Sequence, residues 1–493
     1  PFRFGDGTGG LVLNDMINNY STLYLRSTFN AFSVDRIKNI LFNVNYDDGF
    51  VIWVNGTRVM SRNAPATLSS TAFAPVNHES GIFELYTLDS ADVPLVEGTN
   101  LLCIQAFNLS LNSSDFYFDL GINASLSLPE VPDSLPLNIS RDAGFCDAPF
   151  DLVITSGEPG YDVVYTIDGS NPQTSSTAIR SGTAVTVRID PDISIGRPRT
   201  PVFIVRASLA MDGYSPSKPV TRSFIFTDKV LAQGHPGGDW PTSSVNGQVI
   251  DLDMDPDVVN DPRYSPYMGT SLRDIPSISL VTDNADMFSP SQGIYVNAYM
   301  HGEEWERQCS LELIDTNNSV EFSVNAGVRI RGGASRRPEN PKHAFRLFFR
   351  KEYGPGKLRY PLFGDEGADE FDKVDLRTEQ NYSWSLEGDP HNTFLRDIFS
   401  RDTQRDMGQP YTRGRYYHLY LNGMYWGLYQ TEERPDADYA ETYFGDSEDD
   451  YDVIKVSTEA WPYFNEATDG TMASWQEMWN RCNRGFASNA DYF

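Results

Sequence analysis

The sequence predicts a multidomain chain in which two all-β sandwich domains precede an α+β domain. The chain has 493 residues, more than one hydrophobic core usually serves, so about three domains are expected. Up to residue 226, short segments alternate apolar and polar side chains between turn residues, a pattern typical of half-buried strands. From residue 275, similar segments are mixed with a helical pattern. The expected boundaries are 1–128 and 137–226 for the sandwiches, 227–274 for an irregular linker and 275–493 for the third domain.

The chain is strongly acidic, with a formal net charge of −29 at pH 7. No large basic face is available, which argues against nucleic acid and anionic membranes as partners. No apolar run is long enough to span a membrane. Short strands rich in Ser, Thr, Asn and Asp are typical of secreted bacterial modules. We therefore expect a secreted, extracellular or cell-surface protein, and interpret the chain as a processed piece of a longer one.

Neither the cysteines nor the lone histidine turn predicts a transition-metal site. The four cysteines lie far apart, without the paired spacing of a zinc site or a redox pair. They are Cys103, Cys146, Cys309 and Cys482. A polar turn that contains His301, Glu303 and Glu304 is expected to be solvated.

The first domain, residues 1–128, carries its strand pattern in LYLRSTF, KNILFNVNY, FVIWVNG and LLCIQAFN. Asp48-Gly49 and Asn55-Gly56 are strong hairpin signals on either side of one of these strands. The sequence therefore predicts a β-sandwich in which this strand belongs to two consecutive hairpins.

Acidic side chains in this domain suggest a calcium site. Asp47 and Asp48 are adjacent in a predicted turn, and Asp115 or Asp119 could complete an oxygen shell for Ca²⁺. An Asp at a turn also commonly caps its own backbone, which is the alternative. The run DLDMDPD, residues 251–257, is a second candidate, but it lacks the glycine and glutamate of an EF-hand.

The segments YDDGFVIWVNG, EGTNLLCIQAFN and SSDFYFDL resemble the galactose-binding-like jelly rolls that accompany secreted bacterial enzymes. The resemblance implies that the first domain binds a glycan or a cell-surface polysaccharide. Many such modules serve only as spacers, and that alternative stays open.

Residues 129–136, PEVPDSLP, predict a stiff linker, and residues 137–226 predict a second, smaller sandwich. The hairpin YTIDGSNPQTSS resembles the Ig-like domain found at the C-terminus of chitobiases, which implies a spacer. Residues 227–274 are rich in Pro, Gly and Asp, as expected for a linker or a segment wrapped on a surface.

The third domain contains GVRIRGGASRRPENPKHAFRLFFR, residues 327–350, which predicts two strands joined by a basic loop. At Gly332-Gly333 the backbone can adopt positive φ and approach a ligand closely. Lys342 precedes residues 344–349, which alternate in the manner of a strand. A lysine that faces a glycine-arginine loop is a plausible clamp for nucleotide phosphates. A solvated hairpin loop that binds nothing is the alternative.

A helix and a second hairpin are expected after this loop. Asp389 is the predicted N-cap of the helix, Pro390 its first residue and Gly408 its stop. Asn422-Gly423 is expected to join the strands YYHLYL and YWGLYQTE.

Motif content and order in this region resemble the spore-coat-protein-H (CotH) kinase family. The matching runs are RIRGGASRRPENPKHAFRLFF, YPLFGDEG, DLRTEQNYSW, TFLRDIFSRDTQRDMG and YYHLYLNGMYWGLYQTEERPD. The resemblance covers the chain from about residue 275 onward. It implies a fold like the small lobe of a protein kinase, and phosphoryl transfer from ATP, with Mg²⁺, to a protein acceptor.

The resemblance also implies nucleotide-binding roles for particular residues. Lys342 matches the family's nucleotide-contacting lysine, and Arg331, Ser335 and Arg336 precede it in the loop. Glu432 ends the strand that parallels the kinase hinge, where adenine binds. The predicted helix offers three acids as partners for the lysine: Asp397, Asp402 and Asp406.

Catalytic acids are not assigned. The family carries an Asn-x-Asp element and a Trp-Asp-x-Asp-like element after the hinge, and residues 434–493 match neither. We therefore expect the catalytic part to be absent from this chain, and leave catalytic and metal-binding residues unknown. The alternative function is that of an extracellular structural, adhesion or matrix protein without kinase activity.

Overall fold

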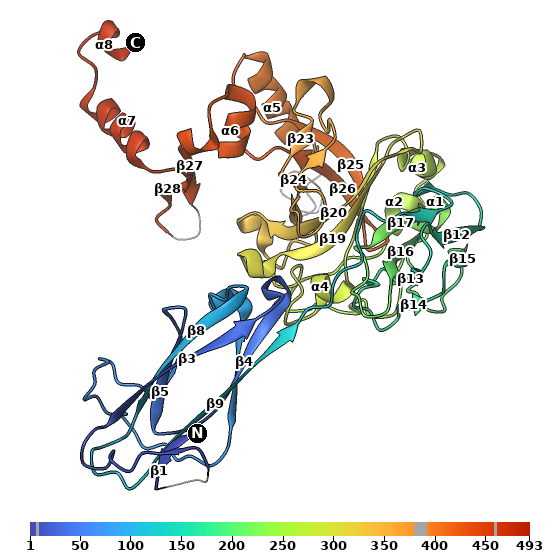
Figure 1. Cartoon of the computed structure of the whole chain (residues 1–493). Helices are drawn as coiled ribbons and strands as arrows, with labels where there is room; N and C mark the ends of the chain where they lie inside the picture. The colour runs from blue at the N-terminus through green and yellow to red at the C-terminus, as the bar shows by residue number, and fades with distance from the viewer. Residues whose placement is uncertain (6–8, 379–390, 392, 458–460) are drawn as a thin grey trace. The chain divides into compact units, whose positions relative to one another are not determined.

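The structure, a computed structural model, describes residues 1–5, 9–378, 391, 393–457 and 461–493. These residues divide into two compact units, 1–130 and 131–493 (Figure 1). Both units are rich in β-strands, so the prediction of a multidomain, mainly β chain is confirmed. Among the described residues, no helix has the length and apolar character that crossing a membrane requires.

The first unit consists of two sheets that share one core. One sheet has the strand order β2-β1-β9-β4-β7 and the other β3-β8-β5-β6. Phe42 and Phe118 of the first sheet and Phe50 and Ile52 of the second are buried together. The strands are β1 (Phe2–Phe4), β2 (Leu11–Val12), β3 (Thr22–Ala31), β4 (Ile37–Asp47), β5 (Gly49–Val54), β6 (Thr57–Arg62), β7 (Glu84–Asp89), β8 (Gly98–Phe107) and β9 (Phe116–Leu126).

The two hairpins predicted in this unit have different outcomes. Asn55 and Gly56, with φ of 48° and 86°, join the paired strands β5 and β6, so this prediction is confirmed. The prediction at Asp48-Gly49 is wrong, because β4 and β5 belong to different sheets. The chain passes there from one sheet to the other, and local turn residues do not distinguish such a crossing from a hairpin.

The second unit begins with another pair of sheets, with strand orders β10-β12-β15 and β11-β17-β16-β13-β14. Leu152 and Ile154 of the first sheet pack with Phe203 and Phe224 of the second. The strands are β10 (Leu137–Ile139), β11 (Gly144–Phe145), β12 (Phe150–Ser156), β13 (Asp162–Thr166), β14 (Ile179–Arg180), β15 (Ala184–Ile189), β16 (Val202–Ala210) and β17 (Val220–Ile225).

Residues 227–274 were expected to form a linker or a segment wrapped on a surface, and they pack onto the third domain. Trp240 and Leu252 are 3% and 7% exposed and belong to the core of that domain. Three short helices occur in the segment: α1 (Thr227–Leu231), α2 (Pro256–Val259) and α3 (Ser265–Ser271). The buried side chains hold the segment in place, although its backbone is largely irregular.

The third domain is built on a closed barrel with the strand order β18-β19-β20-β21-β24-β26-β25. The barrel closes because β18 pairs with both β19 and β25. The strands are β18 (Ser277–Val281), β19 (Arg307–Ile314), β20 (Val320–Arg331), β21 (Ala344–Phe348), β24 (Lys373–Arg377), β25 (Gly414–Leu421) and β26 (Met424–Glu432). The expected α+β lobe resembling a kinase is not confirmed by this arrangement.

Both predicted hairpins of the barrel are present. Strand β20 pairs antiparallel with β21, with Arg331 opposite Ala344. Strands β25 and β26 meet at Asn422-Gly423, with φ of 48° and 86°. Phe345 and the apolar residues two and four positions further on face the core, as the alternation predicts.

The third domain has further helices and strands outside the barrel. They are α4 (Asn284–Phe288), β22 (Leu358–Arg359), β23 (Glu370–Phe371), α5 (Arg396–Asp406), α6 (Ala437–Phe444), β27 (Val453–Ser457), β28 (Phe464–Asp469), α7 (Ala473–Arg484) and α8 (Asn489–Tyr492). The predicted helix is α5, and Gly408 follows its end with φ of 70°. Its predicted start, Asp389 and Pro390, lies outside the described residues.

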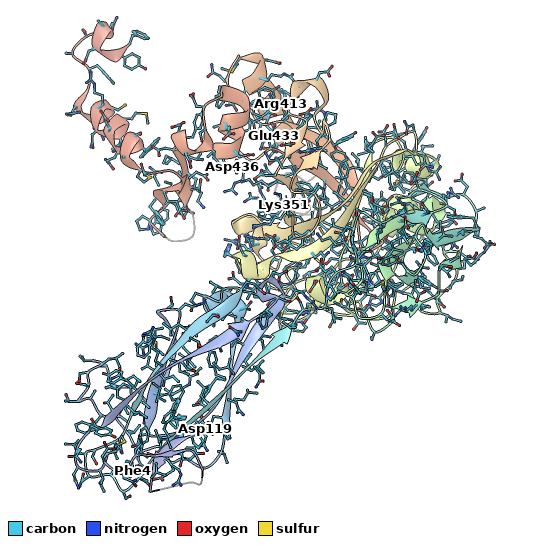
Figure 2. All side chains as sticks on the ribbon, in the orientation of Figure 1. Phe4, Asp119, Lys351, Arg413, Glu433 and Asp436 are labelled. Atoms are coloured by element: carbon cyan, nitrogen blue, oxygen red, sulfur yellow. The ribbon has the colours of Figure 1, made fainter. Side chains whose placement is uncertain are left out.

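Arg413 Nη1 donates to Glu433 Oε2 at 2.9 Å, and Figure 2 shows both side chains near α6.

Candidate functional site

A cavity of about 640 Å³ lies between strands of the barrel and the β27–β28 hairpin. Among the described residues, its lining contains one carboxylate, that of Asp375, and six basic side chains. The basic side chains are Arg329, Arg331, Arg336, Arg346, Arg434 and Lys455. Met300, Trp305 and Phe348 add apolar surface. In a chain of net charge −29, such a cavity is suited to an anionic ligand.

The loop after β20 forms one wall of this cavity. Gly332 has φ of +117°, which L side chains rarely adopt, and a Cβ at this position would require Ser335 Oγ to move, so the loop favours glycine here. Arg336 is buried and donates to the carbonyls of Gly332 at 2.5 Å, Ile330 at 2.6 Å and Ala298 at 2.5 Å. This arginine therefore fixes the loop through backbone hydrogen bonds.

Asp375 holds two arginines of the cavity. Its Oδ1 lies 2.6 Å from Arg346 Nε, and its Oδ2 lies 2.8 Å from Arg331 Nε. Asp375 and Arg346 occupy paired positions on β24 and β21. Burial works against the charge of Asp375, but the hydrogen bond and charge of Arg346 and the charge of Arg331 outweigh it, so its pKa is lowered. The carboxylate consequently stays ionised and orients both guanidinium groups.

A second acidic group connects α5 to the barrel. Arg401 on α5 donates to Asp397 Oδ2 at 3.0 Å, and it lies 3.1 Å from Glu432 Oε1. Arg377 Nη1 lies 2.8 Å from Asp397 and 3.2 Å from Glu432, and Arg331 Nη2 lies 3.6 Å from Glu432. This network therefore extends from the cavity arginine to the helix.

The pKa values of the two carboxyl groups in this network, Glu432 and Asp397, are shifted in opposite directions. Burial and the hydrogen bond with Asp397 raise the pKa of Glu432 to about 7, against the charges of Arg401 and Arg377. Burial also disfavours ionisation of Asp397, but its hydrogen bond with Glu432 and the same two arginines lower its pKa. Asp397 is therefore the carboxylate that stays charged at neutral pH.

The structure brings only part of the predicted nucleotide site together. Arg331 and Arg336 line the cavity, whereas Ser335, Lys342 and Glu432 do not belong to its lining. Glu432 lies behind Arg331, in the network described above. The nucleotide-binding role of these residues stays a prediction.

Lys342 occupies a different place from the one predicted. Its Nζ donates to the carbonyl of Asp251 at 3.1 Å and lies 4.2 Å from the centre of the Trp426 ring. Burial lowers the pKa of Lys342 to about 8, against the charge of Asp251. Lys342 thus contacts Asp251 and Trp426 and does not line the cavity, and its phosphate-binding role stays a prediction. The segment that brings Asp251 to the lysine is distant in sequence, so no local pattern indicates the contact.

The predicted calcium ligands are also only partly brought together. Asp47 and Asp115 lie near each other, and Glu79 lies close to both. Burial, then the charges of Asp48, Asp115 and Glu79, raise the pKa of Asp47 to about 8. Asp48 instead accepts hydrogen bonds from two backbone N–H groups, at 2.8 and 2.6 Å. Asp119, labelled in Figure 2, lies 3.7 Å from the N-terminal ammonium group.

The other residues considered for metal sites have these surroundings in the described part of the chain. Residues 251–257 form no group of three close metal ligands there, and Asp255 instead caps α2. The four cysteines are free thiols. His301 lines the cavity, and Glu303 lies 3.1 Å from Arg350.

Sequence reasoning missed several residues of the cavity. Arg346 was placed correctly on a strand, but its pairing with Asp375 depends on β21 and β24 being neighbours. Arg434 and Lys455 reach the cavity from segments after the barrel. Asp375 lies in the quoted run DLRTEQNYSW, so the motif contained a signal that could have identified it.

Comparisons with solved structures give weak similarities to glycoside hydrolases. The β-glucuronidase 2 of Bacteroides uniformis is 11% identical, with 42% of this chain and 27% of that chain covered and a TM-score of 0.17. The β-glucuronidase of Bifidobacterium dentium is 13% identical, with 43% of this chain and 41% of that chain covered and a TM-score of 0.16. The β-D-mannosidase of Dictyoglomus thermophilum is 12% identical, with 43% of this chain and 30% of that chain covered and a TM-score of 0.17. The chain thus spans less than half the length of these enzymes, and scores this low support no conclusion about it.

Comparison with protein families gives a more specific result. No curated protein matches the chain. Residues 328–488 match the family described as CotH kinase protein. Because the match extends to residue 488, the expectation that the catalytic part is absent is not supported. The cavity lining from Arg329 to Thr468 falls within the segment that is similar to the CotH kinase protein family.

Proposed function

We propose that the cavity binds the phosphates of ATP and that the third domain transfers a phosphoryl group to a protein acceptor. The observation that carries this proposal is the convergence of six basic side chains and a glycine loop on one cavity in an acidic chain. The family match supports a function related to CotH kinases. We propose a secreted or cell-surface location for this activity, with the β-sandwich units in an attachment role.

The residues that line the cavity fit a nucleoside triphosphate. Guanidinium groups donate paired hydrogen bonds to phosphate oxygens, and the backbone at Gly332 can approach them closely. Trp305 and Phe348 also line the cavity, and guanidinium groups lie over their rings: Arg307 is 5.5 Å from the centre of the Trp305 ring, and Arg329 is 4.5 Å from that of Phe348. Carboxylates pair with the basic side chains of the lining: Arg329 Nη2, for example, lies 2.6 Å from Glu306 Oε2. These pairs fix the donors before a ligand arrives, which lowers the cost of ordering them on binding.

The described lining fits Mg²⁺ less well than it fits phosphate. Among the described residues that line the cavity, one has a carboxylate, Asp375. Both of its oxygens already accept hydrogen bonds from arginines. A hard divalent ion needs oxygen ligands that are free to coordinate it. We therefore assign no residue to Mg²⁺ and no step to the ion, and the base that activates the acceptor is also left unassigned.

A pair of charge-matched double variants tests the proposal. Arg434→Gln with Lys455→Gln removes two cations of the lining, whereas Lys357→Gln with Arg359→Gln removes two that pair with Glu370 outside it. Charge-assisted hydrogen bonds contribute about 1.5 to 3 kcal/mol each, so the first double variant should bind ATP at least about tenfold more weakly. The second should bind ATP as the unmodified chain does.

Binding of ATP is measured by titration calorimetry, and transfer by label from γ-labelled ATP on an acceptor protein. Equal affinities of the two double variants would show that ATP does not occupy this cavity. Absence of ATP binding by the unmodified chain would favour the alternative, a structural or adhesion protein without kinase activity.

A further inference from the structure

We propose that the first unit binds a calcium ion through Asp47, Glu79 and Asp115. This site is independent of the function proposed for the barrel. The sequence indicated Asp47 and Asp115, together with two other acids, and the structure replaces those two with Glu79. The ligand class is a hard divalent cation, because the three side chains offer only carboxylate oxygens.

The geometry of the three carboxylates suits calcium. Asp47 ends β4, Asp115 directly precedes β9, and Glu79 lies in the connection before β7, so three separate segments supply the ligands. One oxygen from each residue lies within 4.8 Å of the other two. Calcium binds oxygen at about 2.3–2.6 Å and can therefore bridge oxygens about 5 Å apart, whereas Mg²⁺, at about 2.0–2.1 Å, requires a tighter group.

Two buried oxygen atoms without donors are a second, independent observation. Asp47 is 3% exposed, and its Oδ2 has no hydrogen-bond partner among the residues that the structure describes. The same is true of Oδ1 of Asn108, which is 2% exposed. Nδ2 of Asn108 donates to the carbonyl of Asp115 at 2.9 Å, which places this amide beside the acidic group. Buried acceptors are normally satisfied, and a cation bound by Asp47 would satisfy its Oδ2.

The backbone around the site holds the ligands in position. Asp48 Oδ1 accepts from the N–H of His78 at 2.8 Å, which anchors the residue directly before Glu79. Asp48 Oδ2 accepts from the N–H of Leu109 at 2.6 Å, which anchors the residue directly after Asn108. Asp48 therefore ties both neighbouring segments to the end of β4, and leaves Asp47 to face the cation.

Calcium binding to the full chain tests this proposal. After dialysis against EDTA, titration of CaCl₂ should give heat of binding, and Asp47→Asn or Asp115→Asn should weaken that binding at least about tenfold, as expected for loss of a metal ligand. Asp119→Asn is the matched control, because this acid does not belong to the group of three carboxylates and should leave the affinity unchanged.

Competition between ions gives a second measurement on the unmodified chain. Terbium bound near Tyr46 should show sensitised emission, and Ca²⁺ should displace it at lower concentration than Mg²⁺. The proposal is overturned if CaCl₂ produces no heat, if Asp47→Asn and Asp115→Asn bind calcium as tightly as Asp119→Asn, or if Mg²⁺ displaces terbium better than Ca²⁺. Far-UV circular dichroism of each variant shows that a loss of binding is not a loss of fold.

Discussion

Arg331, at the end of β20, and Arg336, in the loop that follows, have different environments, although the sequence gives them the same character. Arg336 is buried and bonds to backbone carbonyls on both sides of the loop. Arg331 is partly exposed and shares Asp375 with Arg346, so its guanidinium is oriented but still lines the cavity. At the residue scale, the choice between a structural and a ligand-binding role thus depends on what each guanidinium reaches.

Gly332 is the position at which the loop should be most sensitive to substitution. Gly332→Ala introduces a Cβ at φ of +117° and a collision with Ser335 Oγ. Strain of this kind costs about 1–3 kcal/mol, so the second unit should unfold at lower urea concentration.

The matched control for this substitution is Gly408→Ala. This glycine also has positive φ, +70°, but a Cβ there has nothing within 4 Å. It therefore carries the backbone strain without the collision, and its loss of stability should be the smaller one. Equal losses in the two variants would show that the contact with Ser335 does not restrict residue 332.

At the scale of elements, α5 is held to the barrel by charge more than by apolar packing. None of its residues from Arg396 to Asp406 is buried. Asp397 instead contacts Arg377 on β24 and accepts from Gln430 on β26 at 2.8 Å. A helix held in this way depends on a few polar contacts, and Asp397 makes several of them.

Asp397→Asn should therefore loosen α5. Loss of the charge-assisted contacts, about 1.5–3 kcal/mol for one such bond, should speed amide hydrogen exchange in residues 396–406 by about tenfold or more. Because the pKa of Asp397 is lowered in the folded chain, its stabilisation is present at neutral pH and is lost as the pH falls below about 4. The unmodified helix should show the same loss of protection in acid.

Asp402→Asn on the same helix provides the control. This acid is half-exposed and pairs with Arg405 within the helix, at 3.1 Å. Surface pairs contribute little, so exchange in α5 should change by less than about fivefold. Faster exchange of the same size in both variants would contradict the assigned role of Asp397.

At the scale of the whole molecule, the second sandwich and the barrel are parts of one unit. Ile204 and Ile225 of the sandwich are buried with Val281, Ile314 and Tyr420 of the barrel in one apolar cluster. This shared core differs from the spacer role that the sequence implied. The barrel therefore keeps a fixed neighbour on this side.

Glu312 on β19 lies at this boundary, and it predicts a pH dependence. It is fully buried, 3.8 Å from Arg222 on β17, and burial raises its pKa to about 7. The folded chain therefore keeps a proton that the unfolded chain releases near pH 4.5, so stability falls as the pH rises from about 4.5 to 7 and stays lower above that range.

Glu312→Gln removes this titration. The variant should match the unmodified chain at pH 5 and be more stable at pH 8, by on the order of 2 kcal/mol. Thermal unfolding at the two pH values measures the difference, and the exposed Glu321→Gln serves as control because it should show none. A variant that is equally stable or less stable than the unmodified chain at pH 8 would contradict the buried, protonated state of Glu312.

The sequence by itself determined the local features of this protein. The alternation of side chains located many of the strands, and Asn55-Gly56 and Asn422-Gly423 identified two hairpin turns, because these signals act within a few residues. It also indicated the glycine loop with Arg331, because the glycine needed for positive φ, Gly332, is visible in the chain.

Only the tertiary structure decided which distant residues meet. The closed barrel, the crossing at Asp48-Gly49 and the wrapping of residues 227–274 depend on which apolar faces are buried together. The same long-range packing turns Lys342 toward Trp426, away from the predicted clamp. It also brings Glu79 to Asp47, a contact that no spacing along the chain encodes, because burial and strand neighbours are properties of the folded chain.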